Sequence, residues 1–460
     1  MSQFDGAGLW RADPSISGPD PEQAAIAVLG AGYVGLVTAA CLASVGNNLR
    51  VIDVDSARIA GLRLGVVPFS EPGLEDLVRE GLATGRLSFH DAIDAADGAR
   101  MVFVAVGTLD DRGRVTDTNV RAALAGLLGR PQIAPEVVIR STLAPGTMRD
   151  LQRMVADSTA STHLLSNPEF MREGNAIGDF LAPDRIVIGI PPGSSPELAA
   201  NVRAVYAPMS APIVVVDHAA AEMIKIGSNA FLAMKVTFAN ELARVSLAVG
   251  ADIESVRAGI GLDSRIGGAF MTAGPGFGGS CLPSQIEMLT EMSADLGLDL
   301  ELIPAVGHVN RELPRRLIRD LLATRETPKR VGVLGLAFKA NTNDTRESPA
   351  LRLIDALTEF GVHVIRAYDP AVLHLPSHPN VILVEDPYSA AVEADILIIA
   401  TEWDEFRTLD WSRLGEIMAG RDVFDARSVI ERRAAVGAGF VVQSAERRAR
   451  SRAGVDGVAA

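Results

Sequence analysis

A single cysteine at the end of a glycine-rich segment is the strongest chemical signal in this sequence. Cys281 follows Gly274-Pro275-Gly276-Phe277-Gly278-Gly279-Ser280, and the chain has only one other cysteine. Glycines leave room for a substrate to approach the sulfur, as a nucleophilic thiol requires. A buried cysteine that packs as a small apolar side chain explains this segment equally well when it is taken alone. The rest of the chain must decide between the two interpretations.

A dinucleotide fingerprint lies near the N-terminus. The apolar run 25–29 is typical of a buried parallel strand, and it leads into a glycine-rich turn and a helical stretch to position 43. A second strand, 49–52, ends at an acid. Such glycines allow close approach of a pyrophosphate to a helix N-terminus, and an acid about 20 residues on can accept hydrogen bonds from ribose hydroxyls. The pattern predicts a Rossmann domain with a dinucleotide held by Gly30, Gly32, Tyr33, Val34, Gly35 and Asp53.

The identity of this dinucleotide follows from charge. Asp53 would repel the 2′-phosphate of NADP, so NAD is the predicted cofactor. Arg58 lies one helical turn further on, where it could either favour NADP or stack on the adenine. Two more strands, 101–106 and 136–139, end in small polar loops. Because ligands of open parallel sheets bind at the carboxyl ends of the strands, we expect these loops to face the cofactor through Gly107, Thr108, Ser141 and Thr142.

A long apolar helix is predicted from His218 to about Gly250. Its apolar surface exceeds what a single buried face needs, so the helix either bridges two domains or forms the core of a dimer. Lys225 and Asn229 are four residues apart on this helix and share a face. A lysine and an asparagine among apolar neighbours indicate an inward polar site.

A second sheet follows, with apolar runs at 331–339, 363–370 and 394–400. Its order of strands and helices resembles the first domain but lacks the glycine spacing, so we expect it to bind something other than the dinucleotide. The fold class is therefore α/β, with two Rossmann-like doubly wound domains joined by a long central helix. The predicted divisions are a flexible extension at 1–22, an NAD-binding domain at 23–215, a central helical region with the cysteine segment at 216–325, a second Rossmann-like domain at 326–443 and a flexible tail at 444–460.

Composition excludes several other classes. The 460-residue chain has a net charge of −14, which disfavours nucleic acid and anionic membranes as partners. Two cysteines cannot form a disulfide framework and fit a reducing cytoplasm. No stretch has the length of a membrane span, and no targeting segment or metal-ligand cluster is recognised.

The ordered motifs resemble those of the nucleotide-sugar 6-dehydrogenases, the UDP-glucose/GDP-mannose dehydrogenase family, and most of all those of UDP-glucose 6-dehydrogenases. The resemblance covers nearly the whole folded chain, from Gly30 to Arg427. Ser280 stands where relatives of the N-acetylmannosamine type carry a histidine, which favours the UDP-glucose or GDP-mannose branch. The matching segments are 70–74, 167–174, 179–180 with 183–186, 221–225, 263–267, the cysteine segment, 338–339, 344–348, 401–403 and 424–427.

The resemblance implies a four-electron oxidation of a primary alcohol to a carboxylate with two NAD⁺. Cys281 would attack the C6 aldehyde to give a thiohemiacetal, and further oxidation would give a thioester that water releases as the acid. Glu169 would act as a general acid/base through water, and Lys225 and Asn229 would stabilise the developing negative charge on oxygen. A capping carboxylate is the alternative for Glu169, although 167–169 begins a loop rather than a helix.

The resemblance also implies that the domain 326–443 binds the nucleotide sugar and that the region 216–325 forms a dimer, and it implies individual binding residues. Arg265 would reach the sugar from the partner subunit, which makes a homodimer part of the mechanism. Glu173 and Arg346 would lie near the nicotinamide end of NAD. The implied substrate-binding residues are Phe170, Met171, Arg172, Arg265, Phe277, Gly278, Lys339 and Arg427.

One departure from the family pattern stands next to the cysteine. Where relatives carry Lys-Asp after the proline, this chain has Ser284 and Gln285. Gln285 can form hydrogen bonds but cannot take a proton or balance a positive charge, so we expect Lys225 to lack a carboxylate partner. Three interpretations stay open: an active dehydrogenase for UDP-glucose, or for dTDP-glucose or GDP-mannose; an enzyme that stops at the aldehyde or thioester; and a catalytically silent paralogue that binds the sugar nucleotide.

Overall fold

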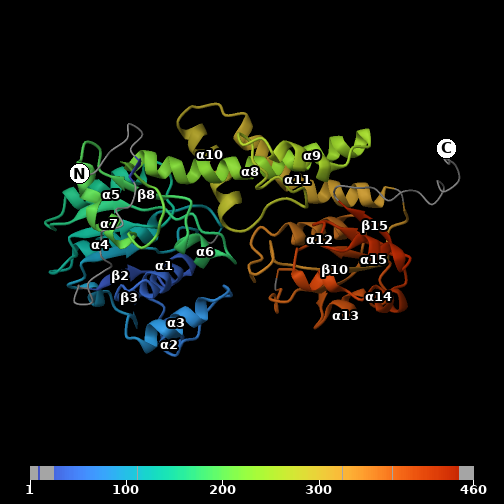
Figure 1. Ribbon diagram of the computed structural model, residues 1–460, viewed down its shortest axis with the longest axis horizontal. Helices are drawn as coiled ribbons and strands as arrows, with labels where there is room; N and C mark the ends of the chain where they lie inside the picture. The colour runs from blue at the N-terminus through green and yellow to red at the C-terminus, as the bar shows by residue number, and fades with distance from the viewer. Residues whose placement is uncertain (1–8, 11–24, 111, 324, 376, 445–460) are drawn as a thin grey trace. The chain divides into compact units, whose positions relative to one another are not determined.

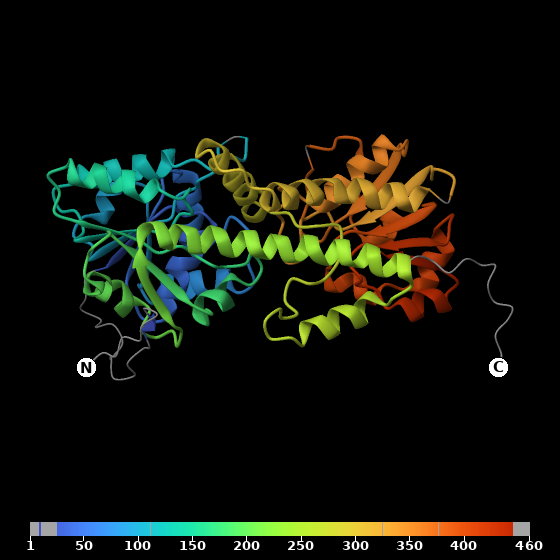
Figure 2. The same cartoon turned by 90° about the horizontal axis from the view of Figure 1, so that it is seen from above.

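The computed structural model describes residues 9–10, 25–110, 112–323, 325–375 and 377–444. The chain divides into two compact units, Met1–Ser228 and Asn229–Ala460 (Figure 1). Helix α8 (His218–Val249) runs across the chain boundary between them as one unbroken helix, as its sequence predicts (Figure 2). The predicted fold class, two Rossmann-like domains joined by a long helix, is confirmed. Within the described part of the chain, no helix is long and apolar enough to cross a membrane.

The first unit is built on a nine-stranded sheet in the order β1-β9-β8-β7-β6-β5-β2-β3-β4. Strands β2 to β7 pair in parallel, whereas β8 is antiparallel to β7 and β1 is antiparallel to β9. The strands are β1 (Leu9–Trp10), β2 (Ile26–Leu29), β3 (Leu49–Ile52), β4 (Leu87–His90), β5 (Met101–Val104), β6 (Glu136–Ile139), β7 (His163–Ser166), β8 (Ile186–Ile190) and β9 (Ile213–Asp217).

Two apolar cores cover the two faces of this sheet. Ile26 and Val28 of β2 belong to one core, and Ala27 and Leu29 belong to the other. Alternate residues of a strand face opposite sides, so a strand buried on both sides reads as a continuous apolar run. The covering helices are α1 (Tyr33–Ser44), α3 (Leu74–Ala83), α6 (Ala176–Leu181) and α7 (Ala200–Val205) for the first core, and α4 (Thr118–Leu128) and α5 (Thr147–Ala156) for the second; α2 (Ser56–Arg63) and two 3₁₀ turns, η1 (Ile93–Ala96) and η2 (Pro196–Ala199), complete the unit.

The second unit has a six-stranded parallel sheet in the order β12-β11-β10-β13-β14-β15. Its strands are β10 (Arg330–Leu334), β11 (Val364–Tyr368), β12 (Val381–Leu383), β13 (Ile396–Ile399), β14 (Asp422–Asp425) and β15 (Val441–Ser444). Its other elements are α9 (Ile253–Gly261), α10 (Cys281–Asp295), α11 (Leu302–Leu322), α12 (Pro349–Glu359), α13 (Pro387–Ala391), η3 (Asp404–Thr408), α14 (Trp411–Ile417) and α15 (Arg432–Gly437).

The second sheet repeats the strand order of β4-β3-β2-β5-β6-β7 in the first sheet. The turn after the first strand is also repeated. Gly30 has φ +102° and donates its N–H to the last residue of β3 at 2.7 Å, and Gly335 has φ +95° and donates likewise to the last residue of β11 at 2.7 Å. The similar order of strands and helices that the sequence shows in the two units therefore reflects a shared Rossmann topology.

The acid that follows the second strand has a different environment in the two units. Asp369, the counterpart of Asp53, is 4% exposed. Its carboxylate accepts backbone N–H groups from Leu336, Ala337, Ala371 and Val372. Asp369 is thus committed to its own loops, which explains how a repeated topology can lose the ribose-binding role of this acid.

The predicted N-terminal extension and tail lie largely outside the described residues. Leu9 and Trp10 are described, and they form β1, which pairs with Val214 and Ile213 of β9. A two-residue strand on a sheet edge differs from the fully flexible lead-in that the Gly/Pro/Ser composition of 1–22 predicts.

A buried histidine begins α8. His218 is 4% exposed, its Nδ1 lies 3.3 Å from Ser166 Oγ, and burial lowers its pKa to about 4. The folded protein therefore holds this imidazole neutral at pH values where an unfolded chain protonates it.

We predict that His218 makes the protein less stable as the pH falls. Below pH 6.5 the unfolded chain takes up a proton that the folded chain refuses until about pH 4, so the free energy of unfolding falls across this range by up to about 3 kcal/mol. Urea unfolding at pH 6.5 and 4.5 measures this fall, and His218→Gln should reduce it. Equal falls in both proteins would contradict the assignment.

Candidate active site

The three fingerprint glycines have three different environments. A Cβ on Gly30 would lie 2.5 Å from the carbonyl oxygen of Ala105, and a Cβ on Gly35 would lie 1.9 Å from the carbonyl oxygen of Gly30. A Cβ on Gly32 would meet nothing within 4 Å. The first and third glycines are thus required by the packing of the turn, while the second leaves open space at the N-terminus of α1. This is where a dinucleotide pyrophosphate fits.

Asp53 at the end of β3 supplies the acid of the fingerprint. Its carboxylate accepts the N–H of Ala31 at 2.6 Å and the guanidinium of Arg58 at 3.1 Å. Arg58 therefore pairs with Asp53 in this structure, a contact that neither sequence-based interpretation of the arginine included. The pair holds the carboxylate at the mouth of the turn, where a ribose would meet it.

The loops after β5 and β6 lie at the carboxyl edge of the sheet. Gly107 accepts a hydrogen bond from Asn119 at 2.9 Å, and Ser141 Oγ donates to the carbonyl of Val106 at 2.7 Å. Ser141 and Thr142 also line a cavity of about 20 Å³ together with Glu222 and Lys225. A cavity of this size has room for about one water molecule, with both polar and apolar side chains around it.

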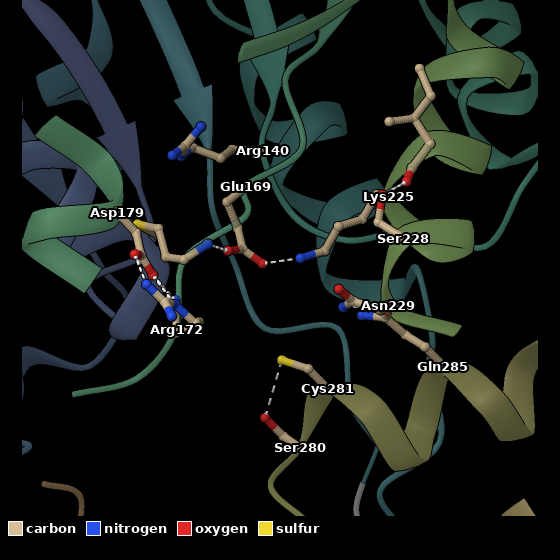
Figure 3. Close-up of polar contacts among 12 residues, drawn as sticks. Arg140, Glu169, Arg172, Asp179, Lys225, Ser228, Asn229, Ser280, Cys281 and Gln285 are labelled. Carbon is tan, nitrogen blue, oxygen red and sulfur yellow. Dashed lines mark hydrogen bonds and ion pairs between the residues drawn. The ribbon is translucent and has the colours of Figure 1, made fainter. Parts of the chain in front are cut away.

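A buried ion pair stands beside this cavity. Glu169 and Lys225 are 6% and 4% exposed, and Lys225 Nζ donates to Glu169 Oε1 at 2.8 Å (Figure 3). The ammonium also lies 5.3 Å from the ring centre of Phe170. The expectation that Lys225 lacks a carboxylate partner is therefore wrong. Sequence reasoning looked for the partner next to the cysteine, whereas the fold supplies it from the loop after β7.

The carboxyl group of Glu169 is held in its charged form. Burial alone would raise the pKa of Glu169, but the Lys225 ammonium and the N–H of Met171, which donates to Oε2 at 2.6 Å, outweigh burial and lower it. A carboxyl with a lowered pKa is ionised at neutral pH and can accept a proton or orient water, but has no proton to donate.

Arg140 fixes one end of the segment that carries Glu169. Arg140 is 4% exposed and donates to Asn167 Oδ1 at 2.7 Å, to Thr38 Oγ1 at 2.7 Å and to Tyr206 Oη at 3.1 Å. Asn167 in turn donates to the carbonyl of Val187 at 2.8 Å. A buried guanidinium with this many acceptors is a rigid support for the residues that follow Asn167.

The other end of the segment is exposed. Arg172 forms a two-pronged ion pair with Asp179 at 2.6 and 2.9 Å (Figure 3). The guanidinium carbon of Arg185 lies over the ring of Phe170, 4.0 Å from the ring centre. Met171 is half-buried. The predicted residues Glu169 to Glu173 are therefore adjacent on one loop of the first unit.

Sequence reasoning missed Arg140 and Glu222. Glu222 is 6% exposed and accepts the N–H groups of Gly146 at 2.7 Å and Met148 at 2.8 Å, which holds the turn into α5. Each had a visible signal: Arg140 is a charge directly after a buried strand, and Glu222 lies one turn before Lys225 on the apolar helix.

The cysteine segment of the second unit ends at the first residue of α10. Cys281 is exposed, so the alternative of a buried apolar cysteine is wrong for it. That alternative describes Cys41, whose burial raises the pKa of its thiol to about 12. The helix N-terminus at Cys281 favours negative charge on sulfur.

Two asparagines that sequence reasoning missed hold this segment in place. Asn310 of α11 accepts the N–H of Phe277 at 2.9 Å and donates to its carbonyl at 2.9 Å. Asn240 of α8 accepts the N–H of Gly274 at 2.8 Å. A Cβ on Gly276 would lie 2.5 Å from Asn310 Oδ1, so the glycine is needed for this close contact. Both asparagines are buried in helices, where nothing in the sequence distinguishes them from ordinary polar residues.

Gln285 supports Asn229. Asn229 Nδ2 donates to Gln285 Oε1 at 2.9 Å, and Gln285 is 3% exposed (Figure 3). Ser284 instead donates its hydroxyl to the carbonyl of Ser280 at 2.5 Å within its own helix. The family departure at 284–285 thus leaves an intact, uncharged hydrogen bond to Asn229.

The remaining predicted substrate residues fall into two groups. Gly278 packs against Glu347 and Phe338, and a Cβ there would lie 2.3 Å from the Glu347 carbonyl oxygen. Arg427 donates to the carbonyls of Phe338 at 2.9 Å and Ala400 at 3.2 Å. These contacts place Arg427 and the 338 loop beside the cysteine segment.

Lys339 and Arg346, predicted to contact the substrate and NAD respectively, lie on the segment 338–347 that packs against the cysteine segment, whereas Arg265 is exposed. Lys339 follows Phe338, with its ammonium 5.5 Å from that ring. Arg346 pairs with Asp344, and its carbonyl accepts the N–H of Gly279 at 3.0 Å, so it belongs to the second unit and not to the unit that carries the fingerprint. Arg265 has 86% of its side chain exposed and pairs with Asp263.

We predict that Lys225→Met destabilises the folded protein by about 3–5 kcal/mol, because it leaves the Glu169 carboxylate buried without its counter-ion. The double variant Lys225→Met, Glu169→Gln removes both charges and should recover more than half of this loss. The free energy of unfolding in urea at pH 7 measures both. A single variant as stable as the wild type would show that the pair does not hold the loop.

Comparison with known proteins agrees with this geometry. Models of three domains of the UDP-glucose/GDP-mannose dehydrogenase family match the chain: the NAD binding domain at 24–210, the central domain at 219–312 and the UDP binding domain at 332–432. The chain is 40% identical over 417 residues to a UDP-glucose 6-dehydrogenase of Rhizobium meliloti (88% of this chain, 95% of the relative). It is 36% identical over 440 residues to a UDP-glucose 6-dehydrogenase of Pseudomonas aeruginosa (91% and 96%).

A solved structure is similar over the same length. A UDP-glucose dehydrogenase from the hyperthermophilic archaeon Pyrobaculum islandicum superposes with a TM-score of 0.80 at 35% identity, covering 93% of this chain and 98% of that chain. The fingerprint, the cysteine segment and most strands of both sheets fall within the matched regions. The chain belongs to the UDP-glucose/GDP-mannose dehydrogenase family and is an NAD-dependent enzyme of the UDP-glucose 6-dehydrogenase type.

Proposed function

We propose that the protein oxidises the C6 alcohol of UDP-glucose to the carboxylate of UDP-glucuronate. The observation that carries this proposal is the buried Lys225–Glu169 pair in the unit that holds the fingerprint, in a chain whose only exposed cysteine, among the described residues, begins α10. The two relatives at 36% and 40% identity are UDP-glucose 6-dehydrogenases, which supports the same substrate. The net reaction converts one alcohol, two NAD⁺ and one water into one carboxylate, two NADH and three protons.

Cys281 carries the covalent steps of this proposal. After the first oxidation the thiolate adds to the C6 aldehyde, forming a C–S bond and an alkoxide that takes up a proton to give a thiohemiacetal. Loss of a second hydride and a proton gives the thioester, and attack of water breaks the C–S bond to release the acid and the thiol. NAD⁺ held at the fingerprint would supply the acceptor for the hydride in each oxidation. The glycines before Cys281 pack closely against their neighbours, while Cys281 itself is exposed and accessible to the sugar.

Lys225 and Asn229 are the proposed donors to the C6 oxygen. They lie four residues apart on one helix, so their side chains project from successive turns of the same face. The Asn229 amide has a second N–H beside the one it donates to Gln285. A charged and a neutral donor together stabilise the alkoxide that forms during both the addition and the hydrolysis.

Glu169 is the proposed base for the hydrolytic water. Its lowered pKa keeps it ionised, so it accepts a proton from water and does not protonate the leaving thiolate. The water-sized cavity next to Lys225 is a site where such a water molecule can be bound before it reacts. This narrows the acid/base role that the family resemblance implies.

The other assignments of site residues are proposals of the same kind. Gly30 to Gly35, Asp53 and the loops after β5 and β6 would hold NAD, and the 277–278 backbone, Lys339 and Arg427 would hold the sugar nucleotide. We place the reaction in the cytoplasm, where both cysteines stay reduced.

We also propose a homodimer built on α8. Three apolar side chains seven residues apart, Phe231, Phe238 and Val245, are 57%, 51% and 59% exposed. This spacing places them on one stripe of the helix, as in a helix that packs against a partner. Arg265, exposed and in the same unit, would then reach the partner's sugar.

Reaction stoichiometry tests the proposed function. We expect UDP-glucose with excess NAD⁺ to give two NADH per sugar consumed, and dTDP-glucose and GDP-mannose to be much poorer substrates. Cys281→Ser should bind UDP-glucose but lose turnover by at least about a thousandfold, because a hydroxyl is a far weaker nucleophile than a thiolate.

Other results would correct the proposal in defined ways. One NADH per sugar would mean that Gln285 does not support the later steps, and preferred turnover of another sugar nucleotide would move the substrate assignment. Binding without any NADH would establish the silent paralogue.

Mixed dimers test the role of Arg265. Neither Arg265→Ala nor Cys281→Ser should be active alone. Co-refolded at equal amounts, they should recover roughly a quarter of wild-type activity, because half of the dimers are mixed and each has one complete site. No recovery would mean that Arg265 does not act across the interface. The α8 interface has its own test, because the double variant Phe231→Glu, Phe238→Glu should be a monomer in light scattering.

A further inference from the structure

Glu71 is a buried carboxylate that neither the fingerprint nor the proposed chemistry uses. It is 7% exposed and lies in the loop between α2 and α3. Its oxygens accept the N–H of Gly174 at 2.6 Å, the N–H of Ala176 at 2.8 Å and the phenol of Tyr33 in a short hydrogen bond. Three hydrogen bonds hold this buried carboxylate in one position, and the same bonds fix the positions of the three donor groups.

The donors come from two functional segments that are far apart in sequence. Tyr33 is the first residue of α1, directly after Gly32 of the fingerprint. Gly174 and Ala176 end the loop that begins at Glu169. Glu71 therefore connects the pyrophosphate turn to the loop with the buried ion pair, across more than 100 residues of chain.

Tyr33 is shaped for this connection. Its ring is half-buried and packs against Phe69 with 5.1 Å between ring centres, so the hydroxyl is the group directed at Glu71. Its backbone N–H lies in the first turn of α1, where a pyrophosphate is bound in this type of turn. One residue thus serves the cofactor through its backbone and Glu71 through its side chain.

We propose that Tyr33 and Glu71 are positioning residues that couple occupation of the fingerprint by NAD to the placement of the loop 169–174. When the dinucleotide fixes the N-terminus of α1, the Tyr33 hydroxyl fixes Glu71, and Glu71 fixes the Gly174 and Ala176 amides. The role of this loop in catalysis rests on the proposed function, but the coupling itself needs only NAD. By linkage, a well-ordered loop then also favours the dinucleotide.

Hydrogen exchange on the whole protein tests the coupling without any sugar nucleotide. We expect saturating NAD⁺ to slow exchange of the Gly174 and Ala176 amides by at least about fivefold in the wild type. Tyr33→Phe keeps the ring on Phe69 and the backbone N–H but removes the hydroxyl. This variant should bind NAD⁺, as titration shows, yet lose the protection of these two amides.

A matched control removes another tyrosine–glutamate hydrogen bond. Tyr368 donates to Glu405 at 3.0 Å in the second unit, so Tyr368→Phe should leave the NAD-dependent protection unchanged. Glu71→Gln replaces one accepting oxygen with an NH₂ and should lose the protection as Tyr33→Phe does. Glu71→Gln therefore tests the coupling even if Tyr33→Phe does not fold.

Steady-state kinetics provide the second reading. A merely structural role would lower only the amount of folded enzyme, whereas a positioning role should lower kcat for the sugar nucleotide in Tyr33→Phe at saturating NAD⁺ with folded protein matched. Equal amide protection in Tyr33→Phe and wild type, or no protection in NAD-bound wild type, would overturn the coupling. A failed stoichiometry test with intact coupling would overturn only the proposed function.

Discussion

The ion pair between Lys225 and Glu169 is the interaction on which the site of the first unit depends. Two charges at 2.8 Å and almost fully buried are stable only together, because either one alone would be a desolvated ion. The pair therefore fixes the helix that carries Lys225 to the loop that carries Glu169. It also sets the charge state on which the proposed chemistry rests, since a carboxylate held charged by an ammonium can accept a proton and the ammonium can donate a hydrogen bond.

The surroundings of the pair serve to hold it still. Arg140 anchors the start of the Glu169 loop through Asn167, and Glu71 anchors its end. In the second unit the same principle appears without charge, because Asn310 holds both backbone groups of Phe277 before the cysteine. Each unit thus surrounds a candidate catalytic group with buried side chains whose hydrogen bonds hold the neighbouring loop in one conformation.

The sequence predicts the parts of this structure that are encoded locally. The strand at 26–29, the turn at Gly30 and the helix at 218–249 follow from periodicity and glycine placement, and the structure confirms them. Contacts between distant segments were not predictable in this way. Glu169 and Lys225 are 56 residues apart, and a lysine gives no local sign of which carboxylate will face it. For this reason the sequence does not reveal Glu169 as the partner of Lys225. The roles of Asn310 and Arg140 were missed for the same reason, because they depend on contacts with distant segments.

The proposed chemistry depends above all on the charge state of Glu169. Infrared difference spectra between pH 3 and 8, wild type against Glu169→Gln, isolate the carboxyl stretch of this one residue. If Lys225 keeps Glu169 charged, the spectra will show an ionised carboxylate throughout the range above the ordinary glutamate pKa of about 4.3, with protonation only below it. A protonated carboxyl near neutral pH would contradict it, because Lys225 would then face a neutral acid and Glu169 could not serve as the base.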